Sequence, residues 1–442
     1  MDLSQLLTMT GNSAYILVVF VVALSVIVAV HEYGHYIVGR WCGIDADVFS
    51  VGFGPVLASR VDKRGTKWQL AAIPFGGYVK FAGDKNAASV GGVENLPPEV
   101  ARRTMMGAPL WARSATVVAG PVANFILAVL IFAGYTLAQG QTTEKVIFEQ
   151  AFDLPAGFES ELLPGDEVIS VDGILIGVSG EDSVDDLPKS PQRTYVVVRD
   201  GVEMEVNGPN LLVPRVDRLF PRSAADDAKL KIDDVIVAVD GVPTYAFADI
   251  VTAVEAVEGA PILLDVWREG EIIEVELAPR RVDNPLPDGT FETRWMIGIG
   301  GEYFFEQKRE SVGVWESLEF AFDRLWFTIK MSLNGLWEVI TGGISSCNIS
   351  GPVAIAQASG SMASQGAGSY ILFIGMISAA IGLFNLFPVP VLDGGHLVFH
   401  AYEAVTRRKP DGMALQVLMF SGLALIGSLM VFALLNDLVL CP

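Results

Sequence analysis

The chain has 442 residues, 51% of them apolar, and carries a formal net charge of −21. Its mean hydropathy of +0.44 exceeds that of a typical soluble protein, and the length favours about three domains. The acidic balance argues against nucleic acid as a partner, because a nucleic-acid site needs a basic surface.

Four stretches lack charged side chains for long enough to cross a bilayer, which takes about 20 residues. They are Leu3–Val30, Ser114–Thr143, a region from Val339 to Leu392, and Gly412–Asn436. In the third region residues 342–368 are rich in Gly and Ser, so we expect the span itself near Ser369–Phe387. The first stretch lacks a basic n-region and a small-residue cleavage site, which favours a retained helix over a signal peptide.

A metal-binding pattern, His31-Glu32-Tyr33-Gly34-His35, lies at the end of the first stretch. HExxH on a helix places two imidazoles on one face with a glutamate beside them, which suits one zinc ion and a general base. Ionisable groups at the edge of a membrane span are costly and are functional candidates. The pattern predicts a metal-dependent hydrolase that acts within the bilayer; the simpler interpretation is a satisfied buried cluster.

Residues Val48–Phe81 alternate apolar side chains with glycine and contain a polar turn, which predicts a hairpin or small sheet. Because this segment follows a membrane helix directly, we expect it to dip into the membrane beside the metal. Irregular backbone is tolerated there only when it is buried in protein or lines a wet cavity.

The central region contains an internal repeat: Gly165–Gly173 recurs as Asp233–Gly241, 68 positions later. Two tandem α+β modules are the simplest interpretation. From Ser311 to Thr341 apolar residues recur at three- and four-residue intervals. This predicts an amphipathic helix, either at the outer membrane–water interface or as a cap on the second module.

The charge pattern orients the spans. Ten Lys/Arg lie between Arg40 and Arg113, whereas residues 139–366 carry 39 Asp/Glu against 17 Lys/Arg. The positive-inside rule places the basic loops in the cytoplasm, and both termini with the acidic region outside. The three cysteines, Cys42, Cys347 and Cys441, have no zinc-finger or disulfide spacing, and we expect small apolar fillers.

A catalytic zinc usually has three protein ligands and one water. The two remaining histidines, His396 and His400, lie beside Asp393 just past the third span. Spans one and three both run inward, so all these side chains should meet at one depth near the cytoplasmic side. Asp393, His396 and His400 are each candidates for the third ligand.

The segment Asn385–Gly395 resembles the NxxPxPxxDG signature of the site-2 proteases, the intramembrane zinc metalloproteases. Further segments resemble the bacterial regulator-of-sigma-E (RseP) branch: Gly52–Pro55, Ile73–Lys80, Ala119–Asn124 and Ser350–Pro352. The resemblance covers nearly the whole chain in the same order. It implies four transmembrane helices, a membrane-associated β-hairpin and two tandem α+β PDZ-like domains.

By this resemblance His31, His35 and Asp393 bind Zn²⁺ and Glu32 is the base that activates a water. His396 is expected to support the site or pack nearby, and His400 to be structural.

The family also implies a substrate site. Asn385 would hold the substrate backbone or stabilise the reacting carbonyl, although it could simply cap the broken helix. Pro388 and Pro390 interrupt the helix and free its backbone. An unwound substrate strand would pair with the sheet that contains Gly76 and Gly77, although these glycines could serve turn geometry alone.

The implied domains are residues 1–143 (two spans with the β region 48–81), 144–208 and 209–282 (PDZ-like), 283–367 (linker and amphipathic helix) and 368–442 (two spans). The implied protein is a multi-pass protease of the cell inner membrane with periplasmic PDZ-like domains. Its substrates would be single-span membrane proteins such as an anti-sigma factor, or remnant signal peptides. A membrane-tethered PDZ adapter and a zinc transporter are the alternatives.

Overall fold

The computed structural model describes residues 3–83, 98–142, 145–176, 190–286, 290–409 and 411–440, and the side chains from residue 13 onward apart from those of residues 75, 98, 99 and 285. The chain forms two compact units. The membrane unit comprises residues 1–135 and 317–442, and the inserted unit comprises residues 136–316. Each is described by itself.

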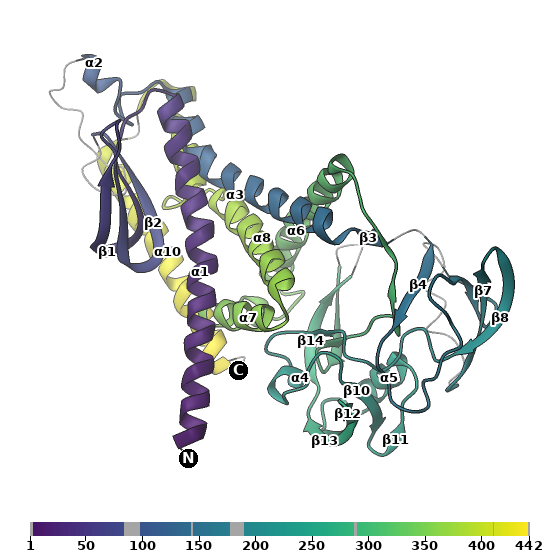
Figure 1. Cartoon of the computed structure of the whole chain (residues 1–442). Coiled ribbons are helices and arrows are strands. Elements are labelled where there is room, and N and C mark those ends of the chain that lie inside the picture. The colour runs from purple at the N-terminus through teal and green to yellow at the C-terminus, as the bar shows by residue number, and fades with distance from the viewer. Residues whose placement is uncertain are drawn as a thin grey trace. The chain divides into compact units, whose positions relative to one another are not determined.

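The membrane unit is mainly helical (Figure 1). Within the described residues, four helical segments are long and apolar enough to span a bilayer: Ser13–Trp41, Leu110–Gln139, Ala367–Asn385 and Gly412–Leu440. They coincide with the four predicted stretches. The helices are α1 (Leu3–Trp41), α2 (Pro98–Ala101), α3 (Leu110–Gln139), α6 (Val314–Thr341), α7 (Pro352–Ser364), α8 (Ala367–Asn385), α9 (Asp393–Thr406) and α10 (Gly412–Leu435).

The predicted β-hairpin is present as β1 (Ala46–Val61) and β2 (Lys67–Phe81), which run alongside α1 (Figure 1). The first part of β1 lies between the two ends of β2, because Phe49 has both Val79 and Trp68 as partners. The bends that allow this contain Gly52, Gly54 and Gly76, all with positive φ. The strand segment from Gly77 to Phe81 therefore forms an edge beside α1.

The hairpin extends along α1 toward its N-terminal end. Near the bend of β2, Ser25 Oγ of α1 donates a hydrogen bond to the Pro74 carbonyl at 3.4 Å. Ser25 precedes His35 by ten residues, about 15 Å along a helix axis. Large apolar side chains near the bends, including Phe53, Leu57 and Ile73, are exposed.

Helix α6 is the amphipathic helix that the sequence predicts. Its buried residues Ala321 and Leu325 pack with residues of α3 and α8, among them Phe132 and Ala379. The helix therefore packs on the membrane unit. Its other side exposes Trp315, Trp326 and Trp337.

The inserted unit contains two modules with matching strands. The first is formed by β4 (Val146–Ala151), β5 (Glu167–Val171), β6 (Ile174–Leu175), β7 (Arg193–Arg199) and β8 (Val202–Gly208). The second is formed by β9 (Arg218–Leu219), α4 (Ala224–Asp227), β10 (Val235–Val239), β11 (Val242–Pro243), α5 (Phe247–Ala256), β12 (Ile262–Arg268) and β13 (Glu271–Leu277).

The internal repeat extends to a buried ion pair. Asp166 pairs with Arg199 in the first module at 2.7 Å, and Asp234 pairs with Arg268 in the second at 2.6 Å. Each aspartate is 1% exposed, so each copy uses the same buried contact between the start of one strand and the end of another.

The chain after residue 282 differs from the expected linker. It forms β14 (Arg280–Pro285), β15 (Phe291–Met296), β16 (Ile299–Gly300) and β17 (Phe305–Gln307). Strand β16 pairs with β9 of the second module and β17 with β4 of the first. Ile299 and Phe304 lie in the two respective cores. A returning strand carries no periodicity that identifies its partner, so the boundary at residue 282 was not readable from sequence.

Two short strands join the ends of the inserted unit: β3 (Gln141–Thr142) pairs with β18 (Arg309–Glu310). We call this pair the neck.

Among the cysteines, Cys347 is disulfide-bonded, which corrects the expectation of an apolar filler; Cys42 is free, and Cys441 lies outside the described residues.

Candidate functional site

Three of the predicted metal ligands lie together in the membrane unit. His31 Nε2 and His35 Nε2 lie 3.1 Å apart, and Asp393 Oδ2 is 3.2 Å from the first and 3.4 Å from the second. The histidine side chains are 12% exposed and the aspartate 17%. Within the described residues, these three form the one group of His, Cys, Asp or Glu with metal-binding geometry.

The spacing of the three donor atoms fits zinc. Ligand bonds of about 2.0–2.2 Å in a tetrahedron place donor atoms about 3.4 Å apart. Asp393 Oδ2 is buried and has no hydrogen-bond partner within the described residues, and two imidazoles with a carboxylate are a known catalytic zinc set. Three protein donors leave the fourth tetrahedral position for water.

Helix α3 supports both histidine rings. His35 Nδ1 lies 2.8 Å from the Thr116 carbonyl, and His31 Nδ1 lies 3.3 Å from the Asn124 amide. Gly120, between these two residues, leaves room for the rings: a Cβ there would lie 2.3 Å from His35 Nε2.

Asp393 is the first residue of α9, and a tight turn places it beside the histidines. The chain between α8 and α9 contains Pro388 and Pro390, which cannot continue the helix. Gly394 and Gly395 lie so close to the turn that a Cβ on either would be 2.2–2.3 Å from the Phe387 or Val389 carbonyl oxygen. These two glycines therefore serve close packing of the turn.

Glu32 lies on the same helix as the histidines but contacts the hairpin. Val79 of β2 donates its backbone N–H to Glu32 Oε2 at 3.0 Å. Gly77 brings this strand close, since a Cβ there would lie 3.3 Å from Glu32 Cγ and 2.7 Å from the Ser50 carbonyl oxygen. A carboxylate beside the donor triad is positioned to accept or return a proton.

The other two histidines are not part of the triad. His396 lies one turn beyond Asp393 on α9, and it is absent from the metal-binding group of the described residues. His400 Nδ1 lies 3.1 Å from Ser114 Oγ of α3. Burial, together with the Arg113 guanidinium, lowers the pKa of His400 to about 4, so this ring is neutral at pH 7.

An ion pair also joins α3 to α9. Arg113 Nη2 lies 2.7 Å from Glu403 Oε1, with the side chains 7% and 17% exposed. The helix that supports the histidines is thus tied to the helix that begins with Asp393.

Of the predicted substrate-binding residues, Asn385 is the last residue of α8, where its Nδ2 donates to the Ile381 carbonyl at 3.0 Å. This contact fits the helix-capping interpretation and leaves the substrate role as a proposal. Gly76 lies at the bend of β2, with φ 137°.

Sequence reasoning missed the residues of α3 that contact the two histidine rings. Gly120 and Asn124 belong to a segment that carries the family resemblance, but nothing in one sequence relates them to the histidines. Thr116 contributes only its backbone carbonyl, which leaves no residue-type signal at all.

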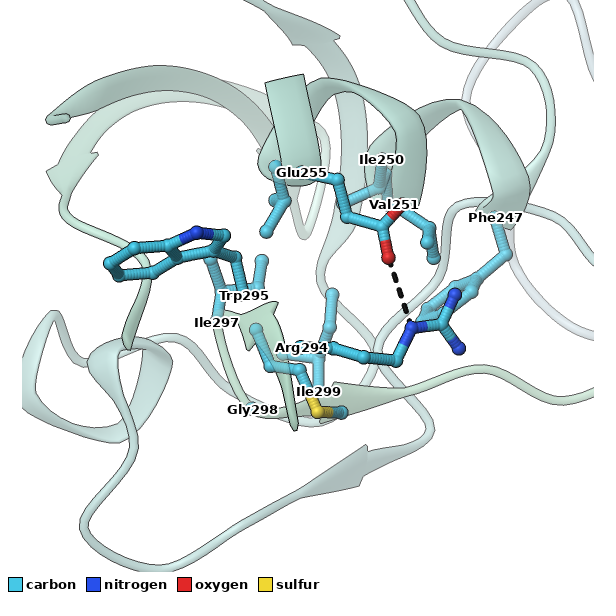
Figure 2. A pocket seen from close by; sticks show the side chains of 11 residues that line it. Phe247, Ile250, Val251, Glu255, Arg294, Trp295, Ile297, Gly298 and Ile299 are labelled. Atoms are coloured by element: carbon cyan, nitrogen blue, oxygen red, sulfur yellow. Dashed lines mark hydrogen bonds and ion pairs between the residues drawn. The ribbon is translucent and has the colours of Figure 1, made fainter. Parts of the chain in front are cut away.

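The inserted unit contains a separate groove, in the second module (Figure 2). Helix α5 forms one side with Phe247, Ile250 and Val254, and residues 294–299 form the other. Figure 2 shows Glu255 of α5 joined across it to Arg294, an ion pair of 3.0 Å. The groove is mainly apolar, with this exposed ion pair at its rim.

Comparison with known proteins agrees with this geometry. A model of peptidase family M50 matches residues 19–429. A protein of Agrobacterium fabrum (strain C58) that bears the name of a zinc metalloprotease is 36% identical over 445 residues, 99% of each chain. "Regulator of sigma E protease" of Salmonella typhi is 32% identical over 464 residues, 95% of this chain and 98% of that protein. The protein of the same name from Haemophilus influenzae is 32% identical over 455 residues, which are 95% of this chain and 97% of that protein.

The match covers the HExxH helix, the hairpin, the inserted unit and the Asp393 turn in one colinear alignment. It favours an enzyme over the adapter and the transporter. The chain therefore belongs to peptidase family M50 and is a zinc metalloendopeptidase.

Proposed function

We propose that this enzyme cleaves peptide bonds within the membrane, in transmembrane segments of single-span proteins. The observation that carries the proposal is the location of the donor triad. His31 and His35 lie inside a helical segment, Ser13–Trp41, that is apolar enough to span a bilayer, and Asp393 follows the end of a second such segment by eight residues.

In this proposal His31, His35 and Asp393 hold the zinc ion. When bound, zinc polarises the substrate carbonyl and lowers the pKa of its water toward about 7. Glu32 accepts the proton of the attacking water and returns it to the departing amine. The hydrogen bond from Val79 orients the Glu32 carboxylate for both transfers.

A helical substrate must unwind before its carbonyls are accessible, because they are hydrogen-bonded within the helix. We propose that the unwound strand pairs with the edge of β2 beside Glu32, in β-augmentation. The support is that Gly77–Phe81 is an edge segment that lies directly beside Glu32, to which Val79 donates its N–H. Gly76 gives the edge its bend, and Asn385, Pro388 and Pro390 would bind the strand on the opposite side.

This edge can be tested with proline. Val79→Pro removes the outward N–H, whereas Val79→Ala keeps it and shortens the same buried side chain. We expect Val79→Pro to lower cleavage of a transmembrane peptide much more than Val79→Ala, with zinc retained in both. Equal activities would remove the edge from the mechanism.

We propose that the two modules of the inserted unit are PDZ-like domains that act outside the cytoplasmic membrane as a size filter. They would exclude substrates whose outer domain is intact and admit trimmed ones, such as a shortened anti-sigma factor or a leftover signal peptide. The groove of the second module offers apolar contacts for a peptide, and the names of the regulator-of-sigma-E relatives support this substrate class.

The filter can be tested by deleting residues 145–308. This deletion keeps β3 and β18, so the neck still closes, and it also removes the returning strands, which would otherwise lack partners. We expect the deletion variant to cleave both trimmed and untrimmed substrates. Unchanged selectivity would contradict the filter.

We further propose that the inserted unit faces the periplasm and that the triad lies near the cytoplasmic side. The basic residues between the first two spans support this orientation. The cysteines support it independently: Cys42, after the first span, is free, whereas Cys347, before the third, is disulfide-bonded. Disulfides persist in oxidising compartments and not in the cytosol.

The central experiment compares the wild-type protein with Glu32→Gln in detergent or liposomes. Glutamine keeps a carbonyl oxygen for the Val79 N–H but cannot act as a base. We expect bound zinc to be equal in the two proteins and cleavage of a model transmembrane peptide to fall by about 10²–10⁴-fold. Retained cleavage in the variant would refute the mechanism.

A further inference from the structure

Both histidines of the triad have their second ring nitrogen engaged by helix α3. For His35 the partner is a backbone oxygen, the Thr116 carbonyl, at 2.8 Å. For His31 the partner is a side chain, since Asn124 Nδ2 lies 3.3 Å from His31 Nδ1. Asn124 is fully buried at 0% exposure.

The metal set requires a specific tautomer of His31. Its Nε2 faces Asp393 and His35, so Nε2 must offer its lone pair, and the ring proton must be on Nδ1. An Nδ1–H needs an acceptor. The side chain that faces it has one available, because Asn124 Oδ1 is buried and has no hydrogen-bond partner within the described residues.

A half-turn of the amide about its Cβ–Cγ bond exchanges Oδ1 and Nδ2, and so directs the carbonyl oxygen at the ring. The backbone of Asn124 is fixed by helix α3 itself, and its carbonyl also accepts a hydrogen bond from Ser378 Oγ of α8 at 2.9 Å. The backbone is thus fixed while the amide can present either atom.

We propose that Asn124 is a positioning residue for the metal: its side-chain carbonyl accepts the Nδ1–H of His31 and fixes the tautomer that binds zinc. The inference rests on the proposed role of His31 as a ligand. Asn124 thus supports His31 in the way that the Thr116 carbonyl supports His35. Only the Asn124 contact comes from a side chain, so only that contact can be removed by substitution.

The test measures zinc affinity, by competition with a chelator, in full-length Glu32→Gln protein so that self-cleavage does not interfere. Asn124→Leu keeps the branched shape of the side chain, is somewhat larger and has no acceptor, and we expect it to bind zinc about 10–100-fold more weakly. Asn124→Ala, which adds no bulk, should show the same loss if the leucine variant does not fold. Asn124→Asp restores an acceptor oxygen and should bind within about threefold of the parent.

Ser378→Ala is the matched control, because it removes the contact to the Asn124 backbone and leaves the amide; its affinity should be unchanged. Parent-like affinity in the leucine and alanine variants would overturn the inference. So would an aspartate variant as weak as the leucine variant, since packing would then explain both.

His31→Ala separates the two levels of the argument. It should abolish tight zinc binding. If it does not, the ligand assignment fails, whatever the Asn124 variants do.

Discussion

The Val79 backbone N–H donates a hydrogen bond to Glu32 Oε2 across 3.0 Å, so the edge of the hairpin and the proposed base contact each other directly. The strand can approach this closely because residue 77 is glycine. A substrate strand that pairs with this edge would arrive beside the base and the donor triad together.

Gly77→Ala should therefore impair catalysis without removing the metal. Its Cβ would lie 2.7 Å from the Ser50 carbonyl oxygen, so the strand must shift and carry the Val79 N–H away from Glu32. A displacement of about 1 Å can cost about 10²-fold in rate. Peptide cleavage and zinc content, measured on the same preparation, check this; a loss of zinc would show that the strand supports the metal instead.

Gly120→Ala should abolish zinc binding. A Cβ at this position would lie 2.3 Å from His35 Nε2 and 2.9 Å from His31 Cε1, and the ring atoms cannot yield without leaving the triad. We expect zinc affinity to fall by at least about 100-fold.

The matched control for this substitution is Gly134→Ala in the same helix, where a Cβ has no neighbour within 4 Å. It should bind zinc normally. If both variants lose zinc to the same degree, the effect comes from the helix and not from the contact with the rings.

His400 should make the protein less stable in mild acid. Its folded pKa of about 4 lies below the unfolded value near 6.5, so the unfolded chain binds the proton first. The contribution to stability is full above pH 6.5 and is lost as the pH falls toward 4, up to about 3 kcal/mol.

His400→Gln should flatten this dependence. Thermal unfolding of the two proteins at pH 7.5 and pH 5.0 measures how much stability each loses on acidification. The neighbouring groups Arg113, His396 and Glu403 are the same in both proteins. Parallel pH profiles would show that the ring is protonated in the folded state.

Removing only one partner of the ion pair between Arg113 and Glu403 should destabilise the protein more than replacing both partners. Arg113→Met leaves a largely buried carboxylate without its partner, which we expect to cost about 3–5 kcal/mol of unfolding free energy. The double variant with Glu403→Met should recover much of that loss. Denaturation of the wild type, both single variants and the double variant gives the coupling energy, and an additive result would contradict it.

Much of the membrane unit could be predicted from the sequence. Length and absence of charge define the four spans, and residues 31–35 define two of the three donors, because a helix places positions four apart on one face. The third donor, Asp393, was chosen over His396 and His400 only through the family resemblance. The alternation of apolar side chains with glycine, and the polar turn, define the hairpin. These signals are local, so one sequence contains them.

The rest depends on contacts between distant segments. The alignment of α3 with α1, which sets Thr116 and Asn124 against the rings, follows from close packing at Gly34 and Gly120, and no periodicity reveals it. The return of residues 291–307 into both modules was hidden for the same reason. The substrate role of Asn385 was predicted from the family resemblance, and its side-chain amide donates a hydrogen bond to the Ile381 carbonyl of its own helix.

The neck has a consequence for engineering. The chain leaves the membrane unit after α3 and re-enters it at α6 through two adjacent paired strands, so the 166 or so residues between them form a cassette with neighbouring ends, an arrangement that tolerates domain exchange. Another folded domain with neighbouring termini could replace the inserted unit at this point without changing how the chain connects within the membrane unit.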